Sequence, residues 1–369
     1  MATIDADAHV VESDYTWDFM DASERKYRPA LVSQERREEG QSVRSVVDTA
    51  SMQRHWLIDG KIRGLARTVL TARQWRELSE ASGREMTVDD ASQSMENVEM
   101  RVRHLDSLGI DIQVVYPTIF IEQVTDKPEI EVALCKSYNR WLADIWKQGG
   151  GRIRWVCVLP LLSMQDSLDL LGWCHDNGAV GVFMRPIEGT RLMHDPYFDR
   201  LYDEVSRLNM SIAVHVANGN PAERELLGQR VSWSGGFWPF LTPVVGACHA
   251  AIGNGLPQRH PQLRIGFIES SASWVPWVIK DIRRRSEGRL LPERFLEDQR
   301  IFVTCYTTDD IAYITKQAGD GVLMIGTDYG HQDMSVELDA LLTLGQDGQL
   351  DRETTAKILD DNPRAFYGL

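Results

Sequence analysis

Residues 153–185, IRWVCVLPLLSMQDSLDLLGWCHDNGAVGVFMR, decide the fold of this chain, because they hold two short apolar runs with a helical segment between them. The runs Ile153–Pro160 and Ala179–Arg185 are rich in Val and Phe and too short for most helices, which is typical of buried strands. Ser167–Asp176 has the period of a helix. A strand, a helix and a second strand in this order predict a parallel pair with a right-handed crossover.

The same unit repeats along the sequence. Strand-type apolar runs occur eight times, at Thr3–Val11, Ile110–Thr118, Ile153–Pro160, Ala179–Arg185, Ser211–Ala217, Leu263–Ser270, Ile301–Tyr306 and Gly321–Asp328. Segments of helical period lie between them, at Asn97–Leu108, Glu129–Lys147, Ser167–Asp176, Pro196–Leu208, Pro239–Asn254, Val275–Arg285 and Thr308–Ala318. Eight such units close into a (β/α)₈ barrel, the TIM barrel. A doubly wound open sheet is the alternative, but no G-x-G-x-x-G motif follows the first strand.

We predict a single barrel domain over residues 1–369, interrupted by two insertions. Residues 13–96 follow the first strand and residues 218–238 follow the fifth. Both insertions leave the carboxyl ends of barrel strands, where barrel enzymes place their active sites, so we expect both to act as lids. The tail, Asp351–Leu369, is expected to form a closing helix.

Composition excludes several classes of function. The chain has 369 residues, 43% hydrophobic and 25% charged, which is typical of a globular protein. A net charge of −14 disfavours nucleic-acid binding. No stretch approaches the roughly 20 apolar residues that cross a bilayer, and the acidic N-terminus is unlike a signal peptide, so we predict a cytoplasmic protein without membrane contact. The cysteines lack CxxC spacing, so we expect neither disulfides nor a zinc ribbon.

The end of the first strand carries residues of metal-binding type. In DADAHVVE (residues 5–12), the period of two places Asp7 and His9 on one face, and Glu12 lies just beyond the strand. A neighbouring carboxylate and imidazole on one face are suited to hold a metal ion. The alternative is a polar strand end with a hydrogen-bonded histidine.

Three other strands also end in ionisable residues: His215 ends the fifth, Glu269 the sixth and Asp328 the eighth. A buried carboxylate needs a partner, because leaving it unpaired costs several kcal/mol. The carboxyl ends of barrel strands meet at one rim, so these side chains should converge there with Asp7 and His9. We therefore predict a metal site at this rim.

The charges at the rim bear on the number of ions. Four carboxylates, Asp7, Glu12, Glu269 and Asp328, would leave a single divalent ion with a surplus of about −2, whereas two divalent ions balance the charge. Carboxylate-rich ligand sets with few histidines suit Fe or Mn. The alternative is one ion, with Glu12 or Glu269 protonated or paired with an arginine.

Two further histidines are candidates for the site. His249 lies among small residues in GACHAA (246–251), on the helix before strand 6, and could reach the metals; a hydrogen-bonded core histidine explains it nearly as well. His331 follows the last strand in DYGHQD (328–333) and is a candidate proton donor. As a loop residue it could equally be solvated.

Aromatic and basic residues suggest how a substrate might be held. The aromatic candidates for an apolar pocket, or for plain core, are Trp233, Phe237, Trp238, Phe240, Trp274 and Trp277. The basic candidates for holding a phosphate-bearing handle such as coenzyme A, or for a solvated helix face, are Lys280, Arg283, Arg284, Arg285 and Arg289.

The chain resembles the amidohydrolase-related family that includes aminocarboxymuconate-semialdehyde decarboxylase and resorcylate-type decarboxylases. The motifs that carry the resemblance, in the family's order, are DADAHVVE, CKSYNRWLADI, GVFMRP, HDPYFDRLYDE, HPQLRIGFIES, LMIGTDYGHQD and DNPRAFYGL. They cover nearly the whole chain. In the family, residues at the positions of Asp7, His9, His215 and Asp328 bind one divalent metal, so the resemblance implies that role for them.

The sequence departs from the decarboxylating members on strand 6. Those members carry a catalytic histidine where this chain has Glu269, in FIESSASWVPW. A glutamate of raised pKa can move protons, although beside a divalent ion it more naturally acts as a ligand. The ES-x-x-x-W turn and DxHxxE resemble a branch that contains the nonheme diiron monooxygenase of platensimycin and platencin biosynthesis. That resemblance implies two irons, dioxygen, an external electron donor and a substrate linked to coenzyme A, such as a diterpenoid.

Our leading hypothesis is a diiron monooxygenase that hydroxylates an apolar small molecule. Its metal ligands are Asp7, His9, Glu12, His215, Glu269 and Asp328, with His249 as a possible addition, and its catalytic candidates are Glu269 and His331. The alternative is a decarboxylase or hydrolase with one Zn or Mn, in which Glu269 is the acid or base. A metal-binding protein without catalysis is the third class. By analogy with the family, a homodimer is expected.

Overall fold

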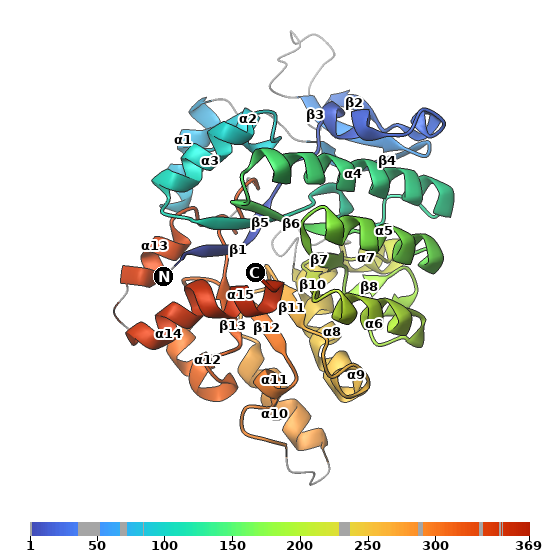
Figure 1. Cartoon of the computed structure of the whole chain (residues 1–369). Helices are drawn as coiled ribbons and strands as arrows, with labels where there is room; N and C mark the ends of the chain where they lie inside the picture. The colour runs from blue at the N-terminus through green and yellow to red at the C-terminus, as the bar shows by residue number, and fades with distance from the viewer. Residues whose placement is uncertain are drawn as a thin grey trace.

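The computed structural model describes residues 2–35, 52–66, 72–83, 85–228, 237–286, 291–331, 335–346, 348 and 350–369. Eight parallel strands form one sheet in the order β1-β5-β6-β7-β10-β11-β12-β13 (Figure 1). Their bounds are β1 (Ile4–His9), β5 (Ile112–Tyr116), β6 (Ile153–Val158), β7 (Ala179–Met184), β10 (Ser211–His215), β11 (Ile265–Ile268), β12 (Ile301–Cys305) and β13 (Leu323–Ile325). Each strand lies within one predicted apolar run, so the predicted (β/α)₈ barrel is confirmed.

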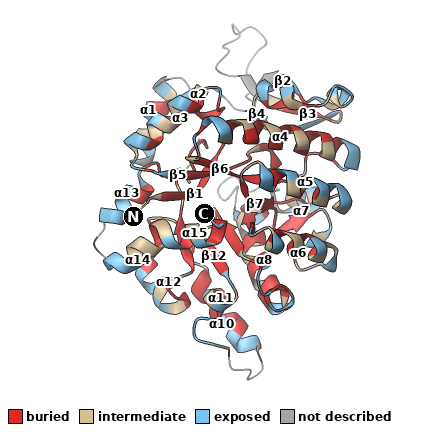
Figure 2. Ribbon diagram, viewed as in Figure 1, coloured by how far each residue is buried: buried red, intermediate tan, exposed pale blue. Residues whose placement is uncertain are grey.

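Helices surround this sheet, and Figure 2 shows a buried centre with exposed residues on the outer helix faces. The α-helices are α1 (Ala72–Ser82), α2 (Asp90–Gln93), α3 (Val98–Ser107), α4 (Pro128–Gln148), α5 (Met164–Asp176), α6 (Asp199–Arg207), α7 (Pro221–Gly228), α8 (Thr242–Gly253), α9 (Leu256–Arg259), α10 (Val275–Arg285), α11 (Phe295–Asp298), α12 (Ile311–Ala318), α13 (Ala340–Gln346), α14 (Arg352–Ala356) and α15 (Asn362–Tyr367). Helix α4 begins at Pro128 and has two glutamates in its first turn, which favours its start at that residue.

The barrel closes where β13 meets β1. A parallel bridge joins Ala8 to Tyr329, just beyond β13. At Gly326 a Cβ atom would lie 2.3 Å from the Cβ of Asp7, so only glycine permits this approach. The predicted closing tail consists of α14, the π-helical turn η7 (Lys357–Asp361) and α15, and the Tyr367 hydroxyl donates to the Ala6 carbonyl at 2.6 Å. This closure brings the ends of the first and last strands together.

The insertion after β1 contains structure that the sequence pattern did not indicate. Its described part begins with the 3₁₀ turns η1 (Asp14–Phe19) and η2 (Arg25–Tyr27). An antiparallel sheet of β2 (Ala30–Glu35), β3 (Met52–Ile58) and β4 (Lys61–Ala66) follows, and β4 contacts the 3₁₀ turn η4 (Ile119–Ile121) beyond β5. The insertion after β10 begins with α7, and residues 229–236 lie outside the described residues. The lid role of both insertions stays a prediction.

Two general expectations can be compared with the described residues. All five cysteines are free and buried, and burial raises the pKa of the Cys248 and Cys305 thiols, which keeps them protonated. Within the described ranges, no helix combines the length and the apolar character that spanning a bilayer requires.

Candidate metal centre

Six ionisable side chains converge at the carboxyl ends of four barrel strands. Their atoms form two groups within which all ligand atoms lie within 4.8 Å of one another, and His9 belongs to both groups. One group is Asp7, His9 and His215; the other is His9, Glu269, Asp328 and His331. The structure thus brings together five of the predicted metal ligands and the predicted proton donor His331.

The two strand-end histidines face each other with their Nε2 atoms 3.1 Å apart. The Nδ1 atom of His9 lies 3.0 Å from the Pro117 carbonyl, and the Nδ1 atom of His215 lies 3.2 Å from the Val216 carbonyl. A carbonyl only accepts hydrogen bonds, so both Nδ1 atoms carry the proton in the neutral rings, and both Nε2 lone pairs point into the same space. Burial lowers the pKa of His9 well below its usual value. Protonation of His9 is therefore disfavoured as a way to remove the repulsion between the two lone pairs.

The Asp7 carboxylate adds negative charge to these lone pairs. Its Oδ1 atom is 3.5 Å from His215 Nε2 and 3.8 Å from His9 Nε2. Among the described residues, no hydrogen-bond donor reaches this buried oxygen. A buried carboxylate oxygen beside two imidazole lone pairs needs a cation, and carboxylate with imidazole is a ligand set that Zn, Mn and Fe accept. The residues present therefore fit a divalent metal ion.

Glu269 and Asp328 approach the histidines from the other side. Glu269 Oε2 is 3.4 Å from His9 Nε2 and 3.2 Å from His215 Nε2, and Asp328 Oδ1 is 3.5 Å from His9 Nε2. Both residues have left-handed backbone, with φ of 55° and 51°. Such a conformation is unfavourable for these residue types and is found where a functional geometry requires it. The Glu269 backbone is held by Thr304, whose Oγ1 accepts from the Glu269 amide at 2.7 Å.

His331 covers this group from the last loop. Its ring stacks on the His9 ring at a centroid distance of 3.7 Å, and its Nδ1 lies 2.8 Å from Asp328 Oδ1. Its Nε2 lies 3.3 Å from the Thr118 hydroxyl. The side chain is partly exposed, unlike those of His9 and His215. His331 is therefore placed to exchange protons between the group and solvent.

A buried polar network, which the sequence did not predict, lies beneath the group. Arg101 donates to the His9 carbonyl at 3.2 Å and to Gln113 Oε1 at 2.8 Å, and Gln113 donates to Asp5 at 2.7 Å. Asp5 also accepts from the Thr327 amide at 2.9 Å, and burial raises its pKa to about 6. The network fixes the backbone of β1 and of the segment after β13. The DADAH sequence, in which aspartates alternate with alanine, could have indicated Asp5. No sequence pattern singled out Arg101 on helix α3.

Glu12 lies outside both ligand groups. Its carboxylate accepts hydrogen bonds from the backbone amides of Thr118 and Ile119, each at 3.0 Å. Burial raises its pKa to about 7 in spite of these bonds. In this structure Glu12 therefore anchors the loop after β5, and its predicted ligand role is not among the contacts observed.

His249 also lies outside both groups. Its Nε2 is 2.9 Å from Asp281 Oδ2 on α10, a neighbouring helix. Arg284 and Arg285 bind the same carboxylate and hold its pKa below the usual range. The structure thus pairs His249 with a helix-surface carboxylate rather than with the rim.

The other predicted binding residues are similarly dispersed. Lys280 donates to the Tyr313 hydroxyl, and Arg283 donates to backbone carbonyls near residue 292. Since Arg284 and Arg285 bind Asp281, these four basic residues are engaged in contacts within the chain. Arg289 lies outside the described residues. Trp238 and Trp277 are exposed, at 49% and 60%. Trp233 lies outside the described residues. Among the described residues, none of the predicted aromatic side chains makes a ring contact with the histidines of the ligand groups.

Comparisons with known proteins agree with this fold. The family model described as amidohydrolase matches residues 4–369. An amidohydrolase structure from Mycobacterium avium subsp. paratuberculosis K-10 superposes with a TM-score of 0.76 at 16% identity, covering 100% of this chain and 98% of that chain. No curated protein matches the chain.

Two of the similar structures are decarboxylases. A 2,6-dihydroxybenzoate decarboxylase from Rhizobium has a TM-score of 0.61 at 17% identity, covering 82% of this chain and 93% of its own. A 5-carboxyvanillate decarboxylase from Novosphingobium aromaticivorans DSM 12444, complexed with manganese and 4-hydroxy-3-methoxy-5-nitrobenzoic acid, has a TM-score of 0.61 at 16% identity, covering 73% and 79%. At such identity these likenesses show the fold alone. The family model, which spans nearly the entire sequence, shows that the chain belongs to the amidohydrolase family.

Proposed function

We propose that this protein is a metal-dependent decarboxylase or hydrolase of a small molecule, with one Mn or Zn ion at the strand-end group. The observation that carries the proposal is the pair of imidazole Nε2 atoms 3.1 Å apart, with Asp7, Glu269 and Asp328 oxygens around them. The manganese in the 5-carboxyvanillate decarboxylase structure supports the choice of ion. A divalent ion bound here supplies positive charge that stabilises negative charge developing on a substrate oxygen.

The chain's own residues divide into holding and proton-moving roles. Asp7, His9 and His215 form a buried group whose ring orientations are fixed by backbone carbonyls, which suits a ligand role. A catalytic ion needs a free coordination position for substrate, so not all six side chains can bind one ion. Glu269 and His331 face the space in front of this group. We assign to them the proton transfer that accompanies loss of CO₂ or attack by water.

Substrate access is the role we propose for the two insertions. Residues 13–96 and 218–238 leave the carboxyl ends of β1 and β10, next to His9 and His215. Closing such segments over a site excludes water and strengthens each charge–charge contact inside it. We propose that they act as lids over the small molecule.

The experiment is reconstitution followed by a substrate screen. Chelated protein is reloaded with Mn²⁺ or Zn²⁺, metal content is measured by mass spectrometry, and CO₂ release from hydroxylated aromatic acids is assayed beside ester and amide hydrolysis. We expect one ion per chain and turnover only in the loaded protein. Equal turnover by metal-free protein, or failure to retain any ion, would contradict the proposal.

A second candidate is the diiron monooxygenase, and one observation favours it. The ligand atoms fall into two overlapping groups that share His9, with three carboxylates and three histidines in total, which is more than a single ion with an open position requires. This candidate further requires dioxygen and an external electron donor, and its substrate would be an apolar molecule linked to coenzyme A. A homodimer is proposed with either candidate.

The two candidates differ in stoichiometry and in oxygen dependence. Protein reconstituted anaerobically with Fe²⁺ is analysed for iron, and products formed under labelled O₂ are analysed by mass spectrometry. Two irons per chain and label in the product would establish the oxygenase. One ion per chain and turnover without oxygen would exclude it.

A further inference from the structure

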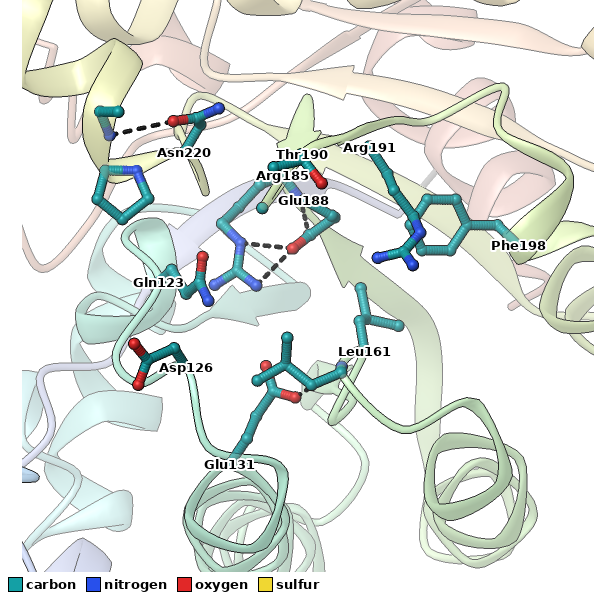
Figure 3. Close-up of a pocket in the computed structure, with 14 residues that line it drawn as sticks. Gln123, Asp126, Glu131, Leu161, Arg185, Glu188, Thr190, Arg191, Phe198 and Asn220 are labelled. Carbon is teal, nitrogen blue, oxygen red and sulfur yellow. Dashed lines mark hydrogen bonds and ion pairs between the residues drawn. The ribbon is translucent and has the colours of Figure 1, made fainter.

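A second cavity opens at the same face of the barrel, over a different set of strands. It has a volume of about 430 Å³, within the range of small-molecule sites. Its lining comes from the segments after β5, β6, β7 and β10 and from the first turn of α4 (Figure 3). None of the six side chains of the metal centre lines it. Asn220 in its wall follows His215 by five residues, which at full extension span at most about 18 Å.

The cavity wall contains three charged side chains that are more than nine-tenths buried: Glu131, Arg185 and Glu188, at 5%, 5% and 7% exposure. Two of these satisfy each other, because Arg185 Nε donates to Glu188 Oε2 at 2.9 Å. Arg185 Nη1 also donates to the carbonyls of Phe120 and Glu122, at 3.1 and 3.0 Å. This ion pair therefore builds the wall and leaves little capacity for a ligand.

Glu131 is different, because within the described residues its carboxylate forms no ion pair, although the charge of Arg185 acts to lower its pKa. Its Oε2 accepts from the Leu162 amide at 2.8 Å. Among the described residues, no Lys, Arg or His nitrogen lies within 4 Å of its carboxylate, and burial raises its pKa to about 7. A buried carboxylate that faces a cavity without a cationic partner is suited to an ammonium group from a ligand.

Arg191 supplies the opposite charge on another side of the cavity (Figure 3). Its guanidinium lies 4.2 Å from the centre of the Tyr197 ring, and within the described part of the chain no carboxylate pairs with it. A guanidinium held on an aromatic face keeps its planar donors available for a carboxylate. In this view Leu161 lies between the two charges, and the Phe198 ring lies beside Arg191.

We propose that this cavity binds a small molecule with an ammonium group, a carboxylate and a short apolar skeleton, that is, an amino-acid-type ligand. The ammonium group binds Glu131, the carboxylate binds Arg191, and the skeleton packs on Leu161 and Phe198. β10 ends at His215, and the segment that follows it carries Asn220 in the cavity wall, so one stretch of chain connects the cavity to the metal centre. The proposal does not depend on the reaction that the metal centre catalyses.

The test uses three probes that share an isobutyl group: L-leucine, 4-methylpentanoate, which lacks the amine, and 3-methylbutylamine, which lacks the carboxylate. Binding to the full-length, metal-loaded protein is measured by titration calorimetry and ligand-observed NMR. We expect one saturable leucine site per chain and at least ten-fold weaker binding of each single-charge probe. Absence of saturable leucine binding, or equal binding of 4-methylpentanoate, would overturn the proposal.

Two variants locate the site. Glu131→Gln should weaken leucine at least ten-fold and leave 4-methylpentanoate unchanged, whereas Arg191→Gln should weaken leucine at least ten-fold and leave 3-methylbutylamine unchanged. Arg191 is only partly buried, so its variant tests the site even if Glu131→Gln folds poorly. Matched controls are the exposed neighbours Glu129→Gln and Arg200→Gln, which should bind leucine as the parent protein does. Leucine affinity that survives in both site variants would place the ligand elsewhere.

Discussion

Buried charged side chains are arranged differently in two parts of the barrel rim. At the ends of β5, β6 and β7, Arg185 and Glu188 form an ion pair with further hydrogen bonds to backbone. At the ends of β1, β10, β11 and β13, carboxylates and imidazole lone pairs face one another, and the described residues place no Lys or Arg among them. The Arg185–Glu188 pair is neutralised within the protein, whereas we propose that the second arrangement binds a cation from outside.

The largest effect is expected from removing the histidine that the two ligand groups of the metal centre share. His9→Ala deletes the side chain shared by both ligand groups, so we expect loss of the bound ion and a fall in turnover of at least about 1,000-fold, since metal catalysis supplies several kcal/mol. Metal analysis and the assay above measure this. The matched control is His249→Ala, whose side chain pairs with Asp281. Retention of the ion by His9→Ala, or its loss in His249→Ala, would contradict the placement of the site.

The Arg185–Glu188 pair should respond in stability rather than in metal content. Arg185→Ala leaves Glu188 buried without its partner, so we expect a fall of about 3–5 kcal/mol in the free energy of unfolding, measured by denaturant titration. The exposed pair of Arg73 and Glu77 is the control, and Arg73→Ala should cost no more than about 1 kcal/mol. A double change to Arg185→Met and Glu188→Leu should recover most of the loss. Equal costs for both arginines would remove the distinction between buried and exposed pairs.

Glu131 sharpens the comparison, because this buried carboxylate lies in the same part of the rim as the Arg185–Glu188 pair but forms no ion pair among the described residues. Its pKa in the folded protein is about 7, above the ordinary value of 4.5, so the folded state binds this proton more tightly. The resulting stabilisation is complete below about pH 4.5 and is lost as pH rises to 7, a change of about 3 kcal/mol. Unfolding free energies of the parent protein and Glu131→Gln across this window should therefore differ in slope. Parallel pH profiles would show that the carboxylate is not buried as described.

The smallest expected effect lies in the network beneath the metal centre. Gln113→Ala breaks the link between Asp5 and Arg101, whose guanidinium holds the His9 carbonyl. We expect a loss of about 10–100-fold in metal affinity, as for other residues that orient ligands, measured by competition with a chelator. Gln148→Ala, at an exposed helix position, is the control. Unchanged affinity in Gln113→Ala would show that β1 holds its ligands without this support.

Strand ends were predictable from the sequence, and loops and cavities were not. Asp7, His9, His215, Glu269 and Asp328 lie at or near the carboxyl ends of predicted strands, and these ends meet in a barrel, so their convergence follows from the fold. The positions of Glu12 and His249 depend on contacts that periodicity does not encode: two loop amides for one and a carboxylate on α10 for the other.

The second cavity shows the same limit. Its wall is assembled from five separate segments, and neither Glu131 nor Arg191 stands out in its own stretch of sequence. The antiparallel sheet β2–β4 was also missed, because its strands lie in a polar insertion without clear alternation. Features that arise from pairing distant segments therefore required the structure.

A diffraction experiment at the zinc absorption edge tests whether the two ligand groups at the rim hold a cation. Crystals of the full chain grown with Zn²⁺ should give an anomalous peak about 2.1 Å from the Nε2 atoms of both His9 and His215. An empty rim in crystals that carry zinc at other positions, with the two Nε2 atoms still facing each other, would contradict the metal centre.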